Sequence, residues 1–214
     1  MIAKGYTNIR AMIETQYGIL SHMITDIAYR YQTQLKQTEE KTDRLARNNS
    51  DGDYEVCHTI LNSFNDVEER SYCLMTESRK ILFCAIFSYY ETMLNEFVLY
   101  YKIANNATLP SQILDSILKA YKTKYGEEIT CIEENVEYAN SIYRLLRNLY
   151  MHGSLSKEKD RCTLFNYAGV THGLKVVGID TIVITDNAFL YKALDCFKTI
   201  LVCVDDAFMQ QLSE

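Results

Sequence analysis

Apolar residues recur every three to four positions along the start of the chain, which predicts a helix over residues 7–47. The repeat comprises Ile9, Ile13, Leu20, Ile24, Ile27, Tyr31 and Leu35. The polar stretch NNSDGD at 48–53 predicts a turn or linker. After it we expect a short helix over 54–64. Asn65 or Asp66 would then cap a further helix that runs to about Ala104.

The helix predicted over 66–104 is apolar almost all round, so we expect other elements to surround it. One narrow polar row interrupts its surface. Its members are Ser88, Glu91, Thr92 and Asn95, which share one stripe because their spacing is i, i+3, i+4 and i+7. A carboxylate in apolar surroundings is costly unless a cation pairs with it. Charged side chains near its centre also make this segment a poor membrane span, so no membrane association is expected.

Residues 111–125 are expected to form a helix that starts at Pro110 and ends at Gly126. A second helix should begin at Thr130, because Thr130 and Glu133 have the spacing of a capping box. This helix is expected to run to about His152, with Gly153 as its stop residue.

The last part of the chain mixes strand and helix signals. Residues 154–161, SLSKEKDR, are interpreted as a charged loop. The glycines and the β-branched and aromatic residues over 162–186 predict one or two short strands that form a hairpin. Thr185 or Asp186 should start a final amphipathic helix to about Leu212.

Composition agrees with a mainly helical protein. Only one proline and eight glycines occur among 214 residues. A chain of this length predicts one sizeable core, organised as a helical extension over 1–65 and a helical domain over 66–214. The expected fold class is mainly α: a helical bundle with a small β-hairpin before the last helix.

Charge and cysteine usage restrict the function classes. A net charge of −6 argues against a protein that coats nucleic acid non-specifically, but it leaves room for a small local RNA site. The seven cysteines lack CxxC pairs and predict reduced, mostly buried thiols in a cytoplasmic protein. The histidines are scattered and no metal-ligand cluster appears, so neither a metal nor a cofactor is expected.

The stretch RLLRNLYMHGS, residues 144–154, carries the candidate chemistry. On a helical wheel, Arg144, Asn148 and Met151 lie on the outer side, opposite the core. Arg147 and His152 lie at the two margins of this outer side, about 140° apart. An apolar Met151 on this side predicts that a second surface covers it. His152 is a titratable group at the helix C-terminus and Arg147 is a permanent cation, and such a pair suits work on a phosphate. The plain alternative is a helix-ending histidine beside a solvated arginine.

The segment RNLYMH, Arg147 to His152, resembles the Arg-x4-6-His motif of HEPN domains (higher eukaryote and prokaryote nucleotide-binding). AIFSYYETMLNEF, residues 85–97, is similar to an early core helix of that family, and the resemblance covers about 70–212. It implies a HEPN-like helical bundle that acts as a homodimeric, metal-independent endoribonuclease in bacterial phage defence or a toxin–antitoxin system. The implied partners are an RNA substrate and, in such systems, an inhibitory protein.

The resemblance also implies roles for individual residues. His152 would act as general base or acid on the ribose 2′-hydroxyl and the leaving oxygen, and Arg147 would hold the scissile phosphate. Asn148 would orient the histidine or a phosphate oxygen. The products would be a 2′,3′-cyclic phosphate and a 5′-hydroxyl.

Further residues are expected to support this site. Glu91 is predicted to pair with Arg144 or Arg147, although a bond to nearby backbone or a solvated edge position would also explain this carboxylate. Basic side chains just beyond the motif are candidates for RNA phosphate contacts, although interleaved acidic residues are also typical of a solvated loop. These candidates are Lys157, Lys159 and Arg161.

Two other readings remain open. Many HEPN proteins have lost activity, so the chain could be an inactive RNA- or nucleotide-binding or dimerisation module. A helical regulator that binds a small ligand is a third possibility, for which no sequence feature argues. Ser154 occupies the position where some toxin members carry a tyrosine, which makes the nucleotidyl-modified type less expected.

Overall fold

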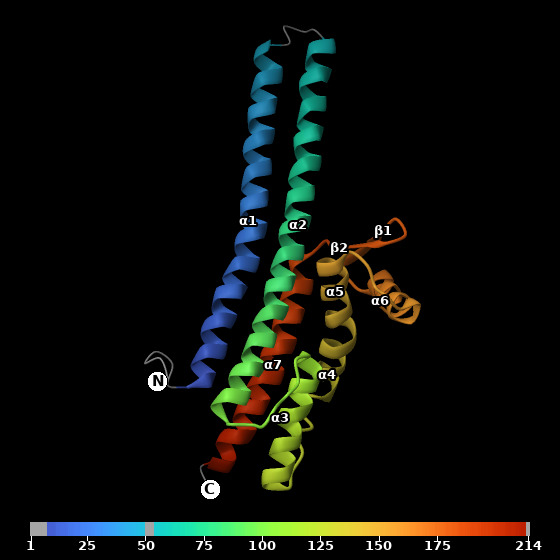
Figure 1. Ribbon diagram of the computed structural model, residues 1–214. Helices are drawn as coiled ribbons and strands as arrows, with labels where there is room; N and C mark the ends of the chain where they lie inside the picture. The colour runs from blue at the N-terminus through green and yellow to red at the C-terminus, as the bar shows by residue number, and fades with distance from the viewer. Residues whose placement is uncertain (1–7, 50–53, 213–214) are drawn as a thin grey trace.

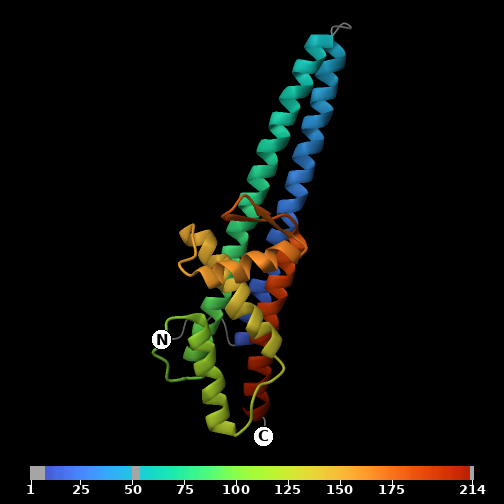
Figure 2. The same cartoon turned by 90° about the vertical axis from the view of Figure 1, so that its right-hand side faces the viewer.

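The computed structural model describes residues 8–49 and 54–212, and within them the fold is mainly helical, as predicted. Two long antiparallel helices, α1 (Ile9–Asn49) and α2 (Tyr54–Tyr100), form its spine. The last helix, α7 (Asn187–Leu212), packs along the half of this pair that contains the first residues of α1 and the last residues of α2 (Figure 1). The other half of the pair projects beyond the body of the molecule (Figures 1 and 2).

The remaining elements cover one side of α2. In chain order they are α3 (Pro110–Tyr125), α4 (Glu133–Tyr138), a π-helical turn η1 (Ala139–Tyr143), α5 (Arg144–His152), α6 (Glu158–Val170), β1 (Leu174–Val177) and β2 (Thr181–Ile184). Helix α5 packs on α2, and α6 packs on α5 and β1 (Figure 1). This arrangement places the end of α5 between α2 and the hairpin.

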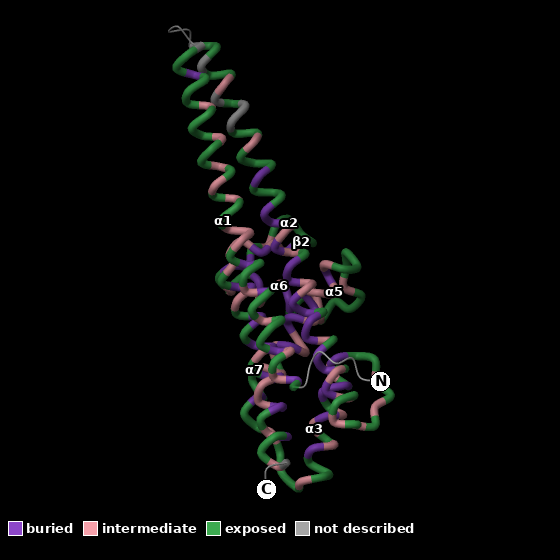
Figure 3. Tube along the Cα trace, turned by 90° about the vertical axis from the view of Figure 1, so that its left-hand side faces the viewer, coloured by how far each residue is buried: buried purple, intermediate pink, exposed green. Residues whose placement is uncertain are grey.

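Aromatic side chains from several helices build the core. The rings of Tyr90 on α2 and Phe197 on α7 stack with their centroids 4.4 Å apart. Phe83 meets Tyr143 and Tyr150 edge-on at centroid distances of 6.1 and 6.0 Å. Buried residues concentrate in the body, whereas the projecting part of α1 and α2 is largely exposed (Figure 3).

Most helix-end signals are confirmed. Pro110 is the first residue of α3, and Gly126 ends this helix in the left-handed region at φ 78°. Gly153 ends α5 at φ 73°, and its N–H donates to the Leu149 carbonyl at 2.8 Å. The side chain of Asp186 accepts the Ala188 N–H at 2.8 Å and so caps α7. These residues have restricted backbone conformations or capping side chains, so their own residue types are enough to predict the helix ends.

The predicted break at residue 65 is absent, because α2 runs unbroken from Tyr54 to Tyr100. Both halves of α2 lie along α1, so a continuous helix keeps its packing partner past this position. The predicted division into 1–65 and 66–214 therefore falls inside α2. Apolar residues of α1 also join the common core, namely Ile9, Ile13, Leu20 and Ile24. Of the predicted turn at 48–53, residues 50–53 lie outside the described part.

Two further local predictions are wrong. Residues 162–170 belong to helix α6, which begins at Glu158, so part of the expected charged loop and of the expected strand region is helical. Leu164 and Ala168 are both buried and lie one helical turn apart, so they face the same side of a helix that packs on α5 and β1. Thr130 also forms no capping box: its carbonyl, not its hydroxyl, accepts the Glu133 N–H at 3.3 Å.

The hairpin of β1 and β2 is confirmed, and its register is set by the pairs Leu174–Ile184 to Val177–Thr181. The Thr185 N–H donates to the Gly173 carbonyl at 2.8 Å just before the first pair. Hydrogen-bonded and non-bonded pairs alternate in an antiparallel ladder. The N–H and C=O of Ile182 therefore point away from β1, toward the free edge of β2.

Exposure corrects two expectations. The row Ser88, Thr92 and Asn95 faces solvent, with Glu91 half-buried beside it, so α2 is not fully surrounded. Of the six described cysteines, all free, only Cys196 is buried, and Cys73, Cys131 and Cys162 are exposed, whereas mostly buried thiols were expected. Within the described residues, no helix is both long and apolar enough to cross a membrane.

Candidate functional site

The candidate motif lies on the exposed side of α5. Leu145, Leu146 and Leu149 are buried, which orients the helix on the core. Arg144, Arg147 and Asn148 are half-buried on the other side, and His152 is exposed at the end of the helix. Met151 is 56% exposed, as the helical wheel predicts. The last two turns of α5 therefore present polar side chains and one apolar side chain to the surroundings.

Glu91 pairs with Arg147 rather than with Arg144. The Arg147 Nη2 lies 3.9 Å from the Glu91 Oε2, and the two side chains are 25% and 29% exposed. The Nη1 of Arg147 also donates to the Asn148 Oδ1 at 3.4 Å, a long bond. The guanidinium is thus positioned by two weak contacts and is still accessible.

Arg144 has a different role in this structure. Its Nε donates to the carbonyl of Asn140, one turn earlier, at 2.7 Å. Asn140 lies in the π-helical turn that joins α4 to α5. The side chain of Arg144 therefore folds back along its own helix and bonds a backbone group there, away from Glu91.

Arg147 and His152 lie on one regular helix, so their separation follows from its geometry. Five residues of α-helix give about 7.5 Å of rise and about 140° of rotation. The two side chains of one α5 consequently leave the helix in different directions. A single phosphate flanked by both groups is reached more readily when a second copy of the helix end contributes one of them.

Burial shifts the pKa values of two groups next to the motif. Burial raises the pKa of the Cys84 thiol on α2, and the positive charge of Arg147 opposes that shift. Burial also raises the pKa of the Tyr150 hydroxyl. Both groups therefore stay protonated and neutral near pH 7.

The basic candidates beyond the motif lie at the start of α6 and differ in their surroundings. Lys157 precedes the helix and Lys159 is in its first turn, and both are exposed. Arg161 instead forms an ion pair with Asp180 in the hairpin turn and donates to the Ile179 carbonyl at 2.7 Å. Its guanidinium links α6 to the hairpin and is not free for a phosphate in this structure.

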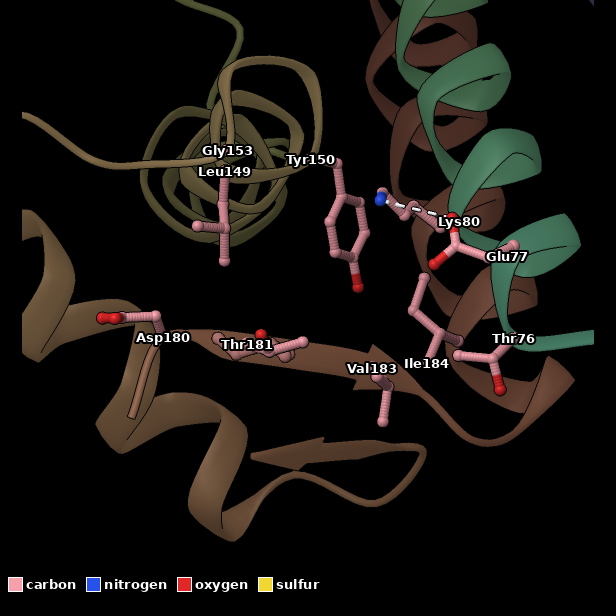
Figure 4. A pocket seen from close by; sticks show the side chains of 11 residues that line it. Thr76, Glu77, Lys80, Leu149, Tyr150, Gly153, Asp180, Thr181, Val183 and Ile184 are labelled. Carbon is pink, nitrogen blue, oxygen red and sulfur yellow. Dashed lines mark hydrogen bonds and ion pairs between the residues drawn. The ribbon is translucent and has the colours of Figure 1, made fainter. Parts of the chain in front are cut away.

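Local sequence patterns contain no signal for a cavity beside the motif. The cavity lies between the end of α5, α2 and β2, and Tyr150 projects into this region (Figure 4). The long-range arrangement of three elements creates the cavity, so local spacing could not reveal it.

The comparisons with known proteins identify no relative. The chain matches no protein-family model, and neither the characterised proteins nor the solved structures include a match.

Proposed function

We propose that this protein is a metal-independent endoribonuclease of the HEPN type that acts as a homodimer. The observation that carries the proposal is the half-exposed Arg147 guanidinium on the same helix as an exposed His152 at the helix end. An arginine binds phosphate through its planar donor fork, and a histidine transfers protons near neutral pH. Both groups are accessible on one helix but leave it in different directions, which is why the proposal requires a second copy of the helix end.

The proposed reaction is internal transesterification of RNA. One His152 takes the proton of the ribose 2′-hydroxyl, and the 2′-oxygen attacks the adjacent phosphorus. The bond from phosphorus to the 5′-oxygen breaks, and that oxygen receives a proton from the His152 of the second protomer. Arg147 stabilises the negative charge that develops on the phosphate. The products are a 2′,3′-cyclic phosphate and a 5′-hydroxyl, and no water is consumed.

An exposed stripe on α2 supports a dimer surface next to this site. Ile81 is 68% and Leu99 is 70% exposed, and both lie on the stripe that contains Ser88, Thr92 and Asn95. Exposed Met151 lies on α5, which packs against α2. Burial of such side chains by a second copy would bring two α5 ends together.

The direct experiment measures cleavage of a single-stranded RNA in the presence of EDTA. We expect wild-type protein to cleave, and His152→Ala and Arg147→Ala each to lower the rate by at least about 100-fold. Arg144→Ala is the matched control, because it removes the same charge from the same helix and should retain most activity. Retained cleavage in both motif variants would refute the proposal, as would a monomer at tens of micromolar in light scattering.

The resemblance also connects the proposal to bacterial phage defence and toxin–antitoxin systems. Under this extension, expression of the wild-type chain in a bacterial host arrests growth, and expression of His152→Ala does not. Rescue by co-expression of a neighbouring gene product would identify an inhibitory partner. Equal growth with both chains would remove the toxin role and leave the cleavage assay as the test of the enzyme.

The ion pair of Arg147 with Glu91 favours a second candidate function. A carboxylate beside the guanidinium competes with a phosphate, which suits an inactive RNA-binding or dimerisation module. In that case no turnover occurs, His152→Ala behaves as wild type, and Arg147→Ala weakens RNA binding or dimerisation.

A further inference from the structure

The cavity beside the motif is small and bounded on three sides. Its volume is about 130 Å³. The end of α5 contributes Leu149 and Tyr150, α2 contributes Glu77 and Lys80, and β2 forms the opposite wall (Figure 4). Small-molecule pockets for larger ligands reach roughly 300–1,000 Å³. A cavity of this size therefore suits one ring system rather than a large ligand.

The charges that line this cavity are already paired. Lys80 Nζ lies 3.3 Å from the Glu77 carboxylate and 5.7 Å from the centre of the Tyr150 ring. Asp180 pairs with Arg161. An anionic ligand would have to break one of these pairs and would meet a carboxylate. The electrostatics of the cavity consequently favour a neutral ligand.

Three neutral hydrogen-bonding groups, from Tyr150 and Ile182, border the cavity, and the Tyr150 hydroxyl becomes accessible only when its side chain shifts. The Tyr150 hydroxyl is buried and has no hydrogen-bond partner within residues 8–49 and 54–212. The backbone N–H and C=O of Ile182 point to the free edge of β2, which lines the same cavity. A buried hydroxyl without a partner is costly, so a ligand that bonds it gains affinity. Four other buried tyrosine hydroxyls in the described part of the chain also lack a partner, but none of them lines this cavity.

We propose that this cavity is a base pocket that binds one neutral nucleobase. The edge of a nucleobase carries an adjacent donor and acceptor, which match the C=O and N–H of Ile182 as a neighbouring strand would. The ring lies in the apolar space beside Leu149 and Tyr150, and a small shift of the Tyr150 side chain lets its buried hydroxyl bond a further polar atom of the base. The neutral base also meets no unfavourable charge.

The base can come from two sources. A free nucleoside is one, and for it the inference is independent of the proposed function. A base in the RNA substrate is the other, and for it the inference rests on the proposed function, because the pocket adjoins the end of α5. Both sources present the same ring and the same hydrogen-bonding edge.

Binding of adenosine, guanosine, cytidine and uridine is measured by calorimetry, and the amide resonance of Ile182 is followed by NMR. We expect at least one nucleoside to bind and to shift the Ile182 amide. Tyr150→Phe should weaken this binding about tenfold, since the base loses the partner of one polar atom. The matched control is Tyr167→Phe, which removes another partnerless buried hydroxyl away from the cavity and should leave binding unchanged.

Competition experiments on His152→Ala protein separate the two sources without RNA turnover. If the nucleoside displaces a single-stranded oligonucleotide of the same base, the pocket takes a base of RNA. If the nucleoside binds but the oligonucleotide does not compete, the ligand is a free nucleoside. Nucleoside binding without RNA cleavage by wild-type protein would refute the proposed function and leave this inference intact.

Three results would overturn the base pocket. The first is no nucleoside binding up to the solubility limit. The second is binding that Tyr150→Phe leaves within about twofold of wild type, or that leaves the Ile182 amide unmoved. The third is equal competition by inorganic phosphate, because the paired charges of the cavity predict that phosphate alone does not bind.

Discussion

The Arg147 guanidinium lies 3.9 Å from the Glu91 carboxylate on the neighbouring helix, and both side chains remain about a quarter exposed. Ion pairs that are partly open to solvent contribute only about 0–1 kcal/mol. A phosphate can therefore replace Glu91 at small cost. The pair positions Arg147, and under the proposed function an RNA phosphate must displace Glu91 to bind it.

Removal of the Glu91 charge is expected to strengthen RNA binding. Glu91→Gln keeps the side-chain volume but removes the competitor for Arg147, so RNA affinity should rise about two- to fivefold. Fluorescence anisotropy with labelled RNA at low salt measures the change. Glu96→Gln, on the same helix, is the charge-matched control and should have a smaller effect. Weaker RNA binding by Glu91→Gln would contradict the proposed competition.

Loss of the buried Arg79 should strongly destabilise the fold. Its Nε donates to the Asn187 Oδ1 and its Nη1 to the Thr185 carbonyl, both at 2.7 Å. Arg79→Met leaves those two acceptors unpaired and should lower the free energy of unfolding by about 3 kcal/mol. Urea denaturation measures this loss. Arg70→Met, at an exposed position of the same helix, should change stability by less than about 0.5 kcal/mol.

The contribution of Asp205 to stability should fall as pH rises. Burial raises the pKa of this carboxyl above 3.8, although the Tyr101 hydroxyl donates to it at 2.9 Å. The folded state therefore keeps the proton to a higher pH than the unfolded state does. The contribution is largest below the unfolded pKa and is lost as pH rises through the raised folded pKa.

The test compares urea unfolding of wild type and Asp205→Asn from below pH 3.8 to neutral pH. The stability advantage of wild type over the variant should shrink over this range. Asp206→Asn, at the exposed neighbouring position, is the control for general charge effects. An advantage that grows with pH would show that hydrogen bonding, rather than burial, dominates at Asp205.

Cys196 should resist alkylation in the native protein. Burial raises the pKa of its thiol to about 12, and its Sγ donates to the Asn135 carbonyl at 3.3 Å. Because the thiolate is the reactive form, iodoacetamide at mildly alkaline pH should modify exposed Cys73, Cys131 and Cys162 first. Mass spectrometry of peptides at several times gives the order. Early modification of Cys196 would indicate that α7 opens locally.

Substitution of two glycines by alanine should have opposite effects. Gly153 ends α5 at φ 73°, so Gly153→Ala should cost about 1 kcal/mol of stability. Gly169 lies inside α6 and has open space around its α-carbon. Gly169→Ala should instead stabilise by about 0.5–1 kcal/mol. Thermal unfolding of both variants measures the two changes in stability. Stabilisation by both substitutions would contradict the assignment of Gly153 as a helix stop.

Local chemistry determined the helix ends and part of the candidate site. Pro110, Gly126 and Gly153 restrict the backbone at their own positions, so their meaning does not depend on distant contacts. The outward placement of Asn148 and Met151 also followed from helical periodicity, because α5 is regular and has one buried face. The activity of these residues stays a prediction.

Some segments fit two conformations or two contacts equally well by local sequence pattern, and only the tertiary structure decided between them. The β-branched and aromatic content of 162–170 suits a strand, but packing of Leu164 and Ala168 on neighbouring elements selects a helix. Two arginines were equivalent partners for Glu91 until the packing of α5 on α2 brought Arg147 close.

The base pocket has the same origin. Tyr150 and Ile182 are far apart in sequence, and neither carries a local signal for a ligand. They line one cavity because α5 and β2 pack together on α2. Sequence thus determined the conformations that single residues impose on their own backbone. Contacts between distant segments depend on the packing of the whole core, so the ion partner of Arg147 and the cavity appeared only in the folded chain.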